Sequence, residues 1–230
     1  MVRLWRGEAP YSAEKQQEWT NRWIRVMGDG RSAWLTAAAR NVILRPLVAM
    51  GRGKCAYCEG RLGAQTYPEI EHYVAKTKEP AQAFLWSNLF PACRLCNNAK
   101  SSQDHQGLLI KCDDEDPELF FRIKLANGEL EPDPRLDAMG EQRAFRTIEI
   151  CDLQRGELCQ QRLDAWQEAA KCLEAIASRN GDLAAYFLKR LLHPGRAYKL
   201  AVRLAFIHGG AEALAAADRE TFRRGEENPK

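Results

Sequence analysis

The residues GKCAYCEGRL at 53–62 and PACRLCNNAK at 91–100 decide how the middle of this chain folds. Each stretch holds two cysteines with two residues between them, so both thiolates of a tight turn can point at one tetrahedral ion. Two such turns complete the closed shell of four sulfurs that is typical of structural zinc sites, and a closed shell leaves no open position for catalysis. We therefore predict one structural zinc ion. Its expected ligands are Cys55, Cys58, Cys93 and Cys96.

Two other interpretations of these cysteines stay open. The four could be unconnected buried residues, since the chain has 8 cysteines in all. One pair could instead be redox-active, but such a pair normally occurs once and opens a helix in a βαβ unit, a context that this sequence lacks. The remaining cysteines show no paired spacing, and the last three fall in or beside helical stretches, where they would pack in the core. They are Cys112, Cys151, Cys159 and Cys172.

The composition is that of an ordinary globular protein, with 45% hydrophobic and 28% charged residues, which excludes disordered and fibrous classes. A net charge of +3 permits nucleic-acid binding but does not require it. Residues 1–10 contain no apolar segment, so we expect no secretory signal. No stretch approaches about 18 uninterrupted apolar residues, so we expect neither a transmembrane helix nor a membrane partner. The expected location is a reducing cytoplasm.

Three regions of the chain differ in pattern. They are 1–50, 51–112 and 113–230. The first region has helical spacing over 12–27 and about 32–50, with a Gly-Asp-Gly break at 28–30. Pro46 should kink the second of these helices or end its first half. The middle region shows weak helical periodicity until 80–89, and a metal would help it to fold because its apolar content is low.

The third region begins with an acidic loop, followed by a hairpin candidate at 119–131 with Asn127-Gly128 at its turn. Beyond Thr147 the pattern is helical throughout, broken by short segments that contain glycine. The expected helices cover 153–178, 183–192, 198–207 and 211–223.

Between and around the cysteine pairs, polar residues recur at fixed intervals in EIEHYVAKTKEP (69–80) and WSNLFPACRLCNNAKSS (86–102). The first stretch carries an acidic residue followed by histidine. The second carries Asn-Leu and then the cysteine pair, followed at once by asparagine and, three positions later, lysine. This order resembles the HNH endonuclease family, whose ββα-metal fold is a β-hairpin followed by a helix wrapped around one metal ion. The chain departs from the family in having Glu71 where aspartate is common, and Ala75 where proline is common.

Phosphodiester hydrolysis needs a water molecule deprotonated in line with the scissile bond, and a neutral imidazole suits that role. His72 is therefore the expected general base. The resemblance implies that Asn88 orients His72. It also implies that Glu71 and Asn97 hold a catalytic Mg²⁺ or Mn²⁺, which suits hard oxygen ligands, and that Lys100 contacts the substrate phosphate.

Each of these residues also has a plainer interpretation. Glu71 could be a solvated carboxylate and His72 a structural histidine. Asn88 could cap a helix, and Asn97 could adopt a left-handed turn after the cysteine pair. The chain would then be a non-catalytic zinc module that binds nucleic acid or protein. A free-standing HNH restriction enzyme is a second alternative, against which the lack of a helix-turn-helix or other base-reading element counts.

The flanking residues narrow the resemblance. Together with the acidic Asp-Pro segment and the hairpin that follow, the quoted stretches look similar to the HNH nucleases of Septu-type and retron-associated anti-phage systems. That resemblance implies a bacterial defence role on DNA, with RNA as the alternative substrate, under the control of a partner ATPase of the ABC/SMC-like type. The fold that we predict is mainly α, with a small ββα-metal core stapled by a four-cysteine zinc site, a β-hairpin and a C-terminal helical region.

Basic residues gather around the motif in the sequence, and a basic surface there would guide a polyanion toward the metal. The modest net charge argues against tight autonomous DNA binding, which depends on many phosphate contacts. The basic residues are Arg52, Lys54, Arg61, Lys76, Lys78, Arg94, Lys100 and Lys111.

Overall fold

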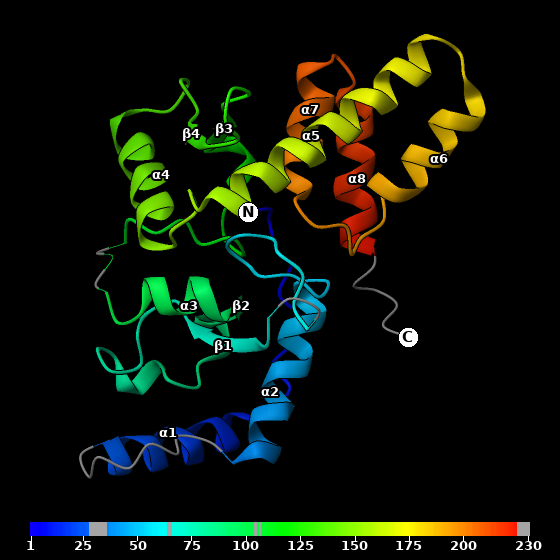
Figure 1. Cartoon of the computed structure of the whole chain (residues 1–230). Coiled ribbons are helices and arrows are strands. Elements are labelled where there is room, and N and C mark those ends of the chain that lie inside the picture. Colours follow the sequence, from blue (N-terminus) through cyan, green and yellow to red (C-terminus); the bar gives the residue numbers. More distant parts are fainter. Residues whose placement is uncertain (28–35, 64–65, 104, 106, 225–230) are drawn as a thin grey trace.

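The computed structural model describes residues 1–27, 36–63, 66–103, 105 and 107–224. Within these residues the fold is mainly α-helical, with two small antiparallel sheets of two strands each, which confirms the predicted class. Figure 1 shows a small unit of two strands and one helix in the middle, with a pair of N-terminal helices on one side and the C-terminal helices on the other. The expected break at 28–30 and the expected start of the second helix lie outside the described residues.

The central unit consists of strand β1 (Pro68–His72), strand β2 (Leu89–Cys93) and helix α3 (Arg94–Lys100), in that order. The two strands pair antiparallel along their whole length, and every residue of β2 is buried. Helix α3 follows β2 without a loop, because the Sγ atom of Cys93 accepts a hydrogen bond from the backbone N–H of Cys96 and caps the helix. This direct junction packs α3 against β1.

The segment that joins β1 to β2 contains two single turns of 3₁₀ helix, η1 (Pro80–Gln82) and η2 (Trp86–Asn88). The sequence shows helical periodicity over 80–89, but the chain forms no α-helix there. Pairing with β1 draws the backbone into an extended conformation from Leu89 onward. The joining segment is therefore a long loop, and its shape depends on side-chain contacts.

Two N-terminal helices flank the ββα unit, α1 (Ala13–Met27) and α2 (Ala37–Met50). The buried tryptophans of α1, Trp19 and Trp23, lie on the side that packs against the β1–β2 loop. Helix α2 packs its buried residues against β1 and β2. Pro46 lies inside α2 and does not end it, since the helix continues to Met50.

The predicted hairpin is confirmed in a shorter form, with strands β3 (Phe121–Ile123) and β4 (Leu130–Pro132) after a 3₁₀ turn, η3 (Pro117–Leu119). Gly128 lies in its turn with a φ of 76°, a left-handed conformation that favours glycine. A Cβ atom at this position would lie 2.0 Å from the carbonyl oxygen of Cys159. The turn therefore needs glycine both for its conformation and for its close approach to the following helices.

Helices fill the rest of the described chain. They are α4 (Ala138–Ile150), α5 (Gly156–Ala177), α6 (Gly181–Leu191), α7 (Lys199–His208) and α8 (Glu212–Arg224). The last four match the four helices expected from the sequence. The sequence pattern predicts helical structure only beyond Thr147, but helix α4 begins earlier, at Ala138. Its start is fixed by Asp137, whose side chain accepts a hydrogen bond from the N–H of Gly140.

Buried charges tie the C-terminal helices together. Lys199 and Arg203 of α7 are fully buried, and both pair with Asp218 of α8. Arg203 also pairs with Glu118, which precedes the hairpin. Each of these buried charges has a partner of opposite sign, and removing one partner would leave an uncompensated charge.

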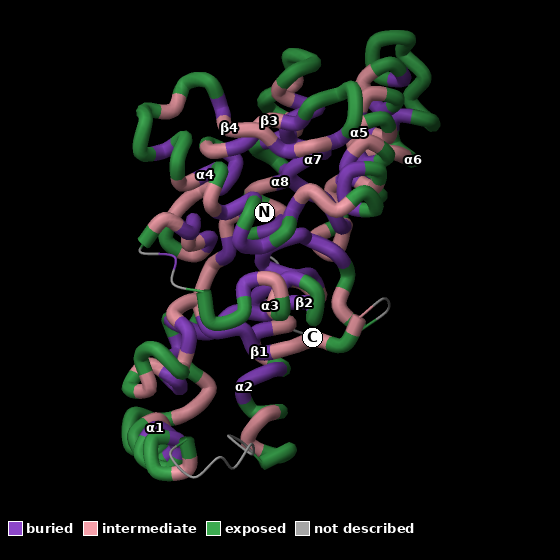
Figure 2. Tube along the Cα trace, turned by 60° about the vertical axis from the view of Figure 1, so that its left-hand side comes forward, coloured by how far each residue is buried: buried purple, intermediate pink, exposed green. Residues whose placement is uncertain are grey.

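Figure 2 shows that the chain is buried mainly where the ββα unit meets the C-terminal helices, while α1 is largely exposed. One hydrophobic cluster contains residues from the N-terminal helices, the ββα unit and the C-terminal helices. The three-part division of the chain stays a prediction. Among the helices that the structure describes, none combines the length and the apolar character needed to span a bilayer.

Candidate functional site

The four paired cysteines come together as predicted. Their Sγ atoms all lie within 4.8 Å of one another, and all four residues are buried. The Sγ atoms of Cys58 and Cys93 are 3.8 Å apart. Four sulfurs at about 2.3 Å from a tetrahedral zinc ion would be spaced by about 3.8 Å, so the cluster is positioned for zinc binding.

The surroundings of the cluster act differently on its members, since burial raises the pKa of Cys55 well above its usual range. Arg155, at the start of α5, donates a hydrogen bond from its guanidinium to the Sγ atom of Cys96 at 3.4 Å. Hydrogen bonds from the neighbouring cysteines lower the pKa of Cys93 well below its usual range. A positive charge beside the sulfurs also offsets part of the negative charge that four thiolates bring to a zinc ion.

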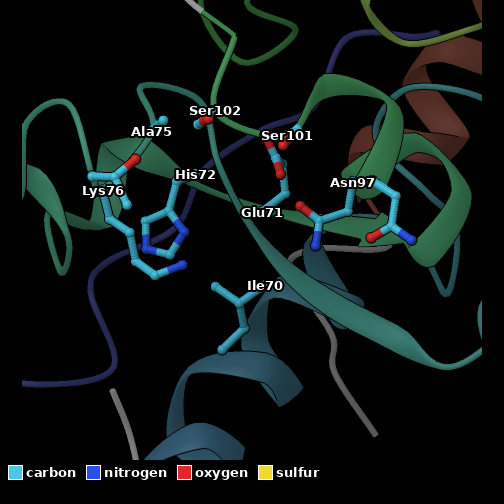
Figure 3. A pocket seen from close by; sticks show the side chains of 10 residues that line it. Ile70, Glu71, His72, Ala75, Lys76, Asn97, Ser101 and Ser102 are labelled. Carbon is cyan, nitrogen blue, oxygen red and sulfur yellow. The ribbon is translucent and has the colours of Figure 1, made fainter. Parts of the chain in front are cut away.

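A cavity of about 440 Å³ lies at the end of β1, and none of the four cysteines lines it. Glu71 and His72 of β1 and Asn97 of α3 all line it, and Figure 3 shows these side chains around one space. The structure thus brings together three of the predicted site residues. Lys76, from the loop after β1, also lines the cavity, and the sequence analysis gave it no individual role.

His72 is almost completely buried, and its Nε2 atom lies 2.9 Å from the carbonyl oxygen of Ala83. A carbonyl oxygen can only accept, so Nε2 carries the proton and Nδ1 carries the lone pair of the neutral ring. Burial, with the nearby charge of Lys76, lowers the pKa of His72 to about 3. The imidazole is therefore neutral at physiological pH.

Glu71 is held in place by buried partners. Lys100 places its ammonium 2.7 Å from the carboxylate Oε1 atom, and the hydroxyl of Tyr57 donates to the same oxygen at 3.4 Å. Burial raises the pKa of Glu71 to about 7, and the positive charge of Lys100 opposes that rise. The carboxyl group therefore titrates near neutral pH.

Lys100 does not face solvent. Its side chain is fully buried, and besides Glu71 it donates to the backbone carbonyl of His72 at 2.7 Å. In this position Lys100 links the end of α3 to Glu71 and His72 at the end of β1. The expected contact of Lys100 with a substrate phosphate stays a prediction, and its contacts in this structure are those of a residue that positions Glu71 and His72.

Asn97 is oriented by a residue that the sequence analysis missed. Its Nδ2 atom donates to the Oε2 atom of Glu69 at 2.5 Å, which leaves Oδ1 as the amide atom that could accept a hydrogen bond or a cation. Glu69 lies two positions before Glu71 on β1, and residues two apart in a strand share a face. The alternation in EIEH could have pointed to it.

Asn88 acts on the loop rather than directly on the imidazole. Its Oδ1 atom accepts from the N–H of Val74 at 2.7 Å, and its Nδ2 atom donates to the carbonyls of Val74 and Gln82 at 3.0 and 3.1 Å. These bonds close the loop between β1 and β2 next to Ala83, whose carbonyl faces His72. The expected orienting role is thus compatible with an indirect path through the loop.

Replacing Asn88 with alanine is expected to lower the free energy of unfolding by about 1–3 kcal/mol, because the partly buried backbone groups of Val74 and Gln82 lose their partners. Urea denaturation of the zinc-loaded protein measures this loss. Ser87→Ala, at the exposed neighbouring position, is the control and should stay within about 0.5 kcal/mol of the unaltered protein. Equal stability of both variants would show that the hydrogen bonds of Asn88 do not stabilise the fold.

The basic residues around the motif do not form one face. Lys54 is buried and donates to the carbonyls of Pro194 and Arg196, and Arg52 donates to the carbonyl of Phe222. These two residues bind the first cysteine turn to the C-terminal helices. Lys54 and Arg52 therefore make structural contacts, and the expected substrate-guiding surface would consist of the other basic residues.

Residues 55–103 match the family model for HNH endonucleases. Septu protein PtuB of Bacillus thuringiensis is 36% identical over 77 residues, which are 33% of this chain and 28% of that protein. The match therefore spans less than a third of the length of that relative. Both cysteine pairs and all the cavity residues named above fall within 55–103. The chain therefore contains an HNH endonuclease domain, and this domain holds the four-cysteine cluster and the cavity formed by Glu71, His72 and Asn97.

Proposed function

We propose that the protein is a metal-dependent nuclease that hydrolyses phosphodiester bonds in DNA, with RNA as the alternative substrate, and that it leaves a 5′-phosphate. The observation that carries this proposal is the convergence of Glu71, His72 and Asn97 on one cavity within the HNH domain. A non-catalytic zinc module would have no need for a buried neutral histidine beside a carboxylate and an amide in one open cavity.

The cavity suits a hard divalent cation. The carboxylate of Glu71 and the Oδ1 atom of Asn97 are oxygen donors of the kind that Mg²⁺ and Mn²⁺ prefer, and both side chains are oriented by other residues. When bound there, Mg²⁺ or Mn²⁺ would neutralise charge on the scissile phosphate and on the leaving oxygen. The four-cysteine cluster is the proposed site of a separate, structural zinc ion.

The residues of the chain supply the proton chemistry and the positioning. His72 takes the proton of the attacking water at Nδ1, because the Ala83 carbonyl holds the proton on Nε2. Asn88 keeps the loop that carries Ala83 in place. Lys100 fixes Glu71 and the backbone of His72 relative to α3, so a shift of either residue would disturb the alignment on which the rate depends.

The affinity for Mn²⁺ is expected to depend on pH through Glu71. Below its pKa of about 7 the carboxyl is protonated and a proton competes with the cation, whereas above that pH the carboxylate is ready to bind. Affinity should therefore rise about tenfold per pH unit up to about pH 7 and then level off. His72 stays neutral over this range and contributes no step.

Electron paramagnetic resonance titration of zinc-loaded protein with Mn²⁺ measures this dependence, with Glu71→Gln as the control that cannot titrate. A constant affinity between about pH 5 and pH 8 would contradict the assignment of Glu71.

The biological role that we propose is anti-phage defence in the bacterial cytoplasm, under the control of an ABC/SMC-like ATPase. The similarity to Septu protein PtuB supports the defence role. The net charge of +3 supports control by a partner, because few phosphate contacts give weak intrinsic affinity for DNA. Surfaces outside the HNH domain would then be available for the ATPase.

The test combines purified zinc-loaded protein with plasmid DNA or with RNA, with Mg²⁺ or Mn²⁺, and with or without a candidate ABC/SMC-like ATPase from the same genome. We expect metal-dependent cutting of DNA that increases with the ATPase. Cutting at one short sequence by the isolated protein would favour a free-standing restriction enzyme. No cutting in any combination, with zinc bound and the fold intact, would favour the non-catalytic module.

A further inference from the structure

We propose that Lys76 contacts the scissile phosphate on the His72 side of the cavity and stabilises the charge that develops there during hydrolysis. The inference rests on the proposed nuclease function and deepens it, because it names a substrate-contacting residue. It starts from the difference between two lysines: Lys100 is buried against Glu71 and does not line the cavity, whereas Lys76 does.

Lys76 returns to the cavity because the chain turns just after β1. The N–H groups of Lys78 and Glu79 both donate to the carbonyl of Ala75, at 2.8 and 3.0 Å, and this turn reverses the backbone. Lys76 lies inside the turn and lines the cavity together with His72. Figure 3 shows the side chain of Lys76 next to the His72 ring. In this view Glu71 lies between these two residues and Asn97.

Lys76 contacts helix α1 through Trp23. The indole Nε1 atom of Trp23 donates to the backbone carbonyl of Lys76 at 3.4 Å, and the ring centre lies 5.7 Å from the Lys76 Nζ atom. Trp23 is itself buried, so it forms a fixed wall. Because the lysine is ordered before substrate binds, little conformational entropy is lost when it makes a contact.

The charge of the cavity also points to Lys76. Among the described residues that line the cavity, Lys76 is the basic side chain, and Glu71 is the acidic one. The proposed cation would lie between Glu71 and Asn97. A phosphate bound between that cation and His72 would have non-bridging oxygens within reach of Lys76. The ammonium of Lys76 offers three donors to these oxygens. A donor aimed at developing charge in a partly buried site is worth far more than the same charge in water.

The experiment compares Lys76→Ala with Lys78→Ala, which removes the same charge from an exposed position in the same turn. We expect Lys76→Ala to lower the single-turnover cleavage rate about 100-fold or more, at low and at high salt. Lys78→Ala should lose only a few-fold, and added salt should remove that loss because it reflects long-range steering. Lys76→Arg should recover part of the rate.

A binding measurement separates this inference from the function on which it rests. In a His72→Ala background with Ca²⁺, the affinity for a fluorescent DNA duplex should fall more with Lys76→Ala than with Lys78→Ala. Equal effects of the two substitutions on binding and on cutting would overturn the role of Lys76 and leave the nuclease proposal intact. If the parent protein neither binds nor cuts nucleic acid with its ATPase present, the nuclease proposal fails and this inference fails with it.

Discussion

Removal of zinc by a strong chelator is expected to unfold the HNH domain. Structural zinc contributes about 10–16 kcal/mol in small four-ligand sites, which matches or exceeds the whole stability of a typical domain, about 5–15 kcal/mol. Residues 53–62 contain no helix or strand, and their turn depends on the cysteine ligands and on contacts with the C-terminal helices. The loss should therefore reach β1 and β2 as well, because the second cysteine pair opens α3.

Circular dichroism and thermal unfolding, with zinc content measured in parallel, test this expectation. Cys93→Ser should lose zinc and melt far below the unaltered protein. Cys172→Ser, at an equally buried position in α5, is the matched control and should keep its zinc with a loss of about 1–2 kcal/mol. Retention of the fold by Cys93→Ser, or by the zinc-free protein, would show that the cluster is not a zinc staple.

Replacement of His72 with alanine is expected to lower the cleavage rate by about 10²–10⁴-fold, the usual contribution of a positioned general base. Zinc content should not change, because His72 belongs to the cavity and not to the sulfur cluster. Burial keeps the ring neutral at physiological pH, and the carbonyl of Ala83 fixes the tautomer in which Nδ1 carries the lone pair. The loss should therefore appear in the rate at saturating DNA more than in DNA affinity.

His105→Ala is the matched control, because His105 is also buried, lies just after the HNH domain, and donates from Nε2 to the carbonyl of Tyr73. It should lose stability and keep the cutting rate within about one order of magnitude. Single-turnover cleavage of a labelled duplex, with zinc content confirmed, measures both variants. Loss of cutting in His105→Ala and not in His72→Ala would move the base to the other histidine.

The four-cysteine cluster could be predicted because its signal is local, and the ββα unit because the order of the motif resembles the HNH family. The spacing of each cysteine pair dictates a turn, and two pairs dictate one shared ion, whatever the rest of the chain does. Asn88 and Asn97 could be named from the order of the motif. The same holds for the hairpin, where Asn127-Gly128 specifies the turn through its own backbone preference.

The roles of the lysines could not be predicted, because exposure is decided by tertiary packing. Lys54, Lys76 and Lys100 look alike in the sequence. One is buried against carbonyls of the α6–α7 connection, one lines the cavity, and one is fully buried between α3 and β1. A short helix that starts at the end of a buried strand turns its last residue inward, and no pattern within the motif records that direction.

The measurement that tests the central claim most directly is the initial rate of plasmid nicking as Mn²⁺ is added to zinc-loaded protein freed of other divalent ions, with the proposed partner ATPase present. The account predicts no cutting before addition, a rate that saturates with Mn²⁺, and no such response in Glu71→Gln at unchanged zinc content. Cutting without added Mn²⁺, or an identical response in Glu71→Gln, would contradict a nuclease whose cation is held by Glu71 and Asn97.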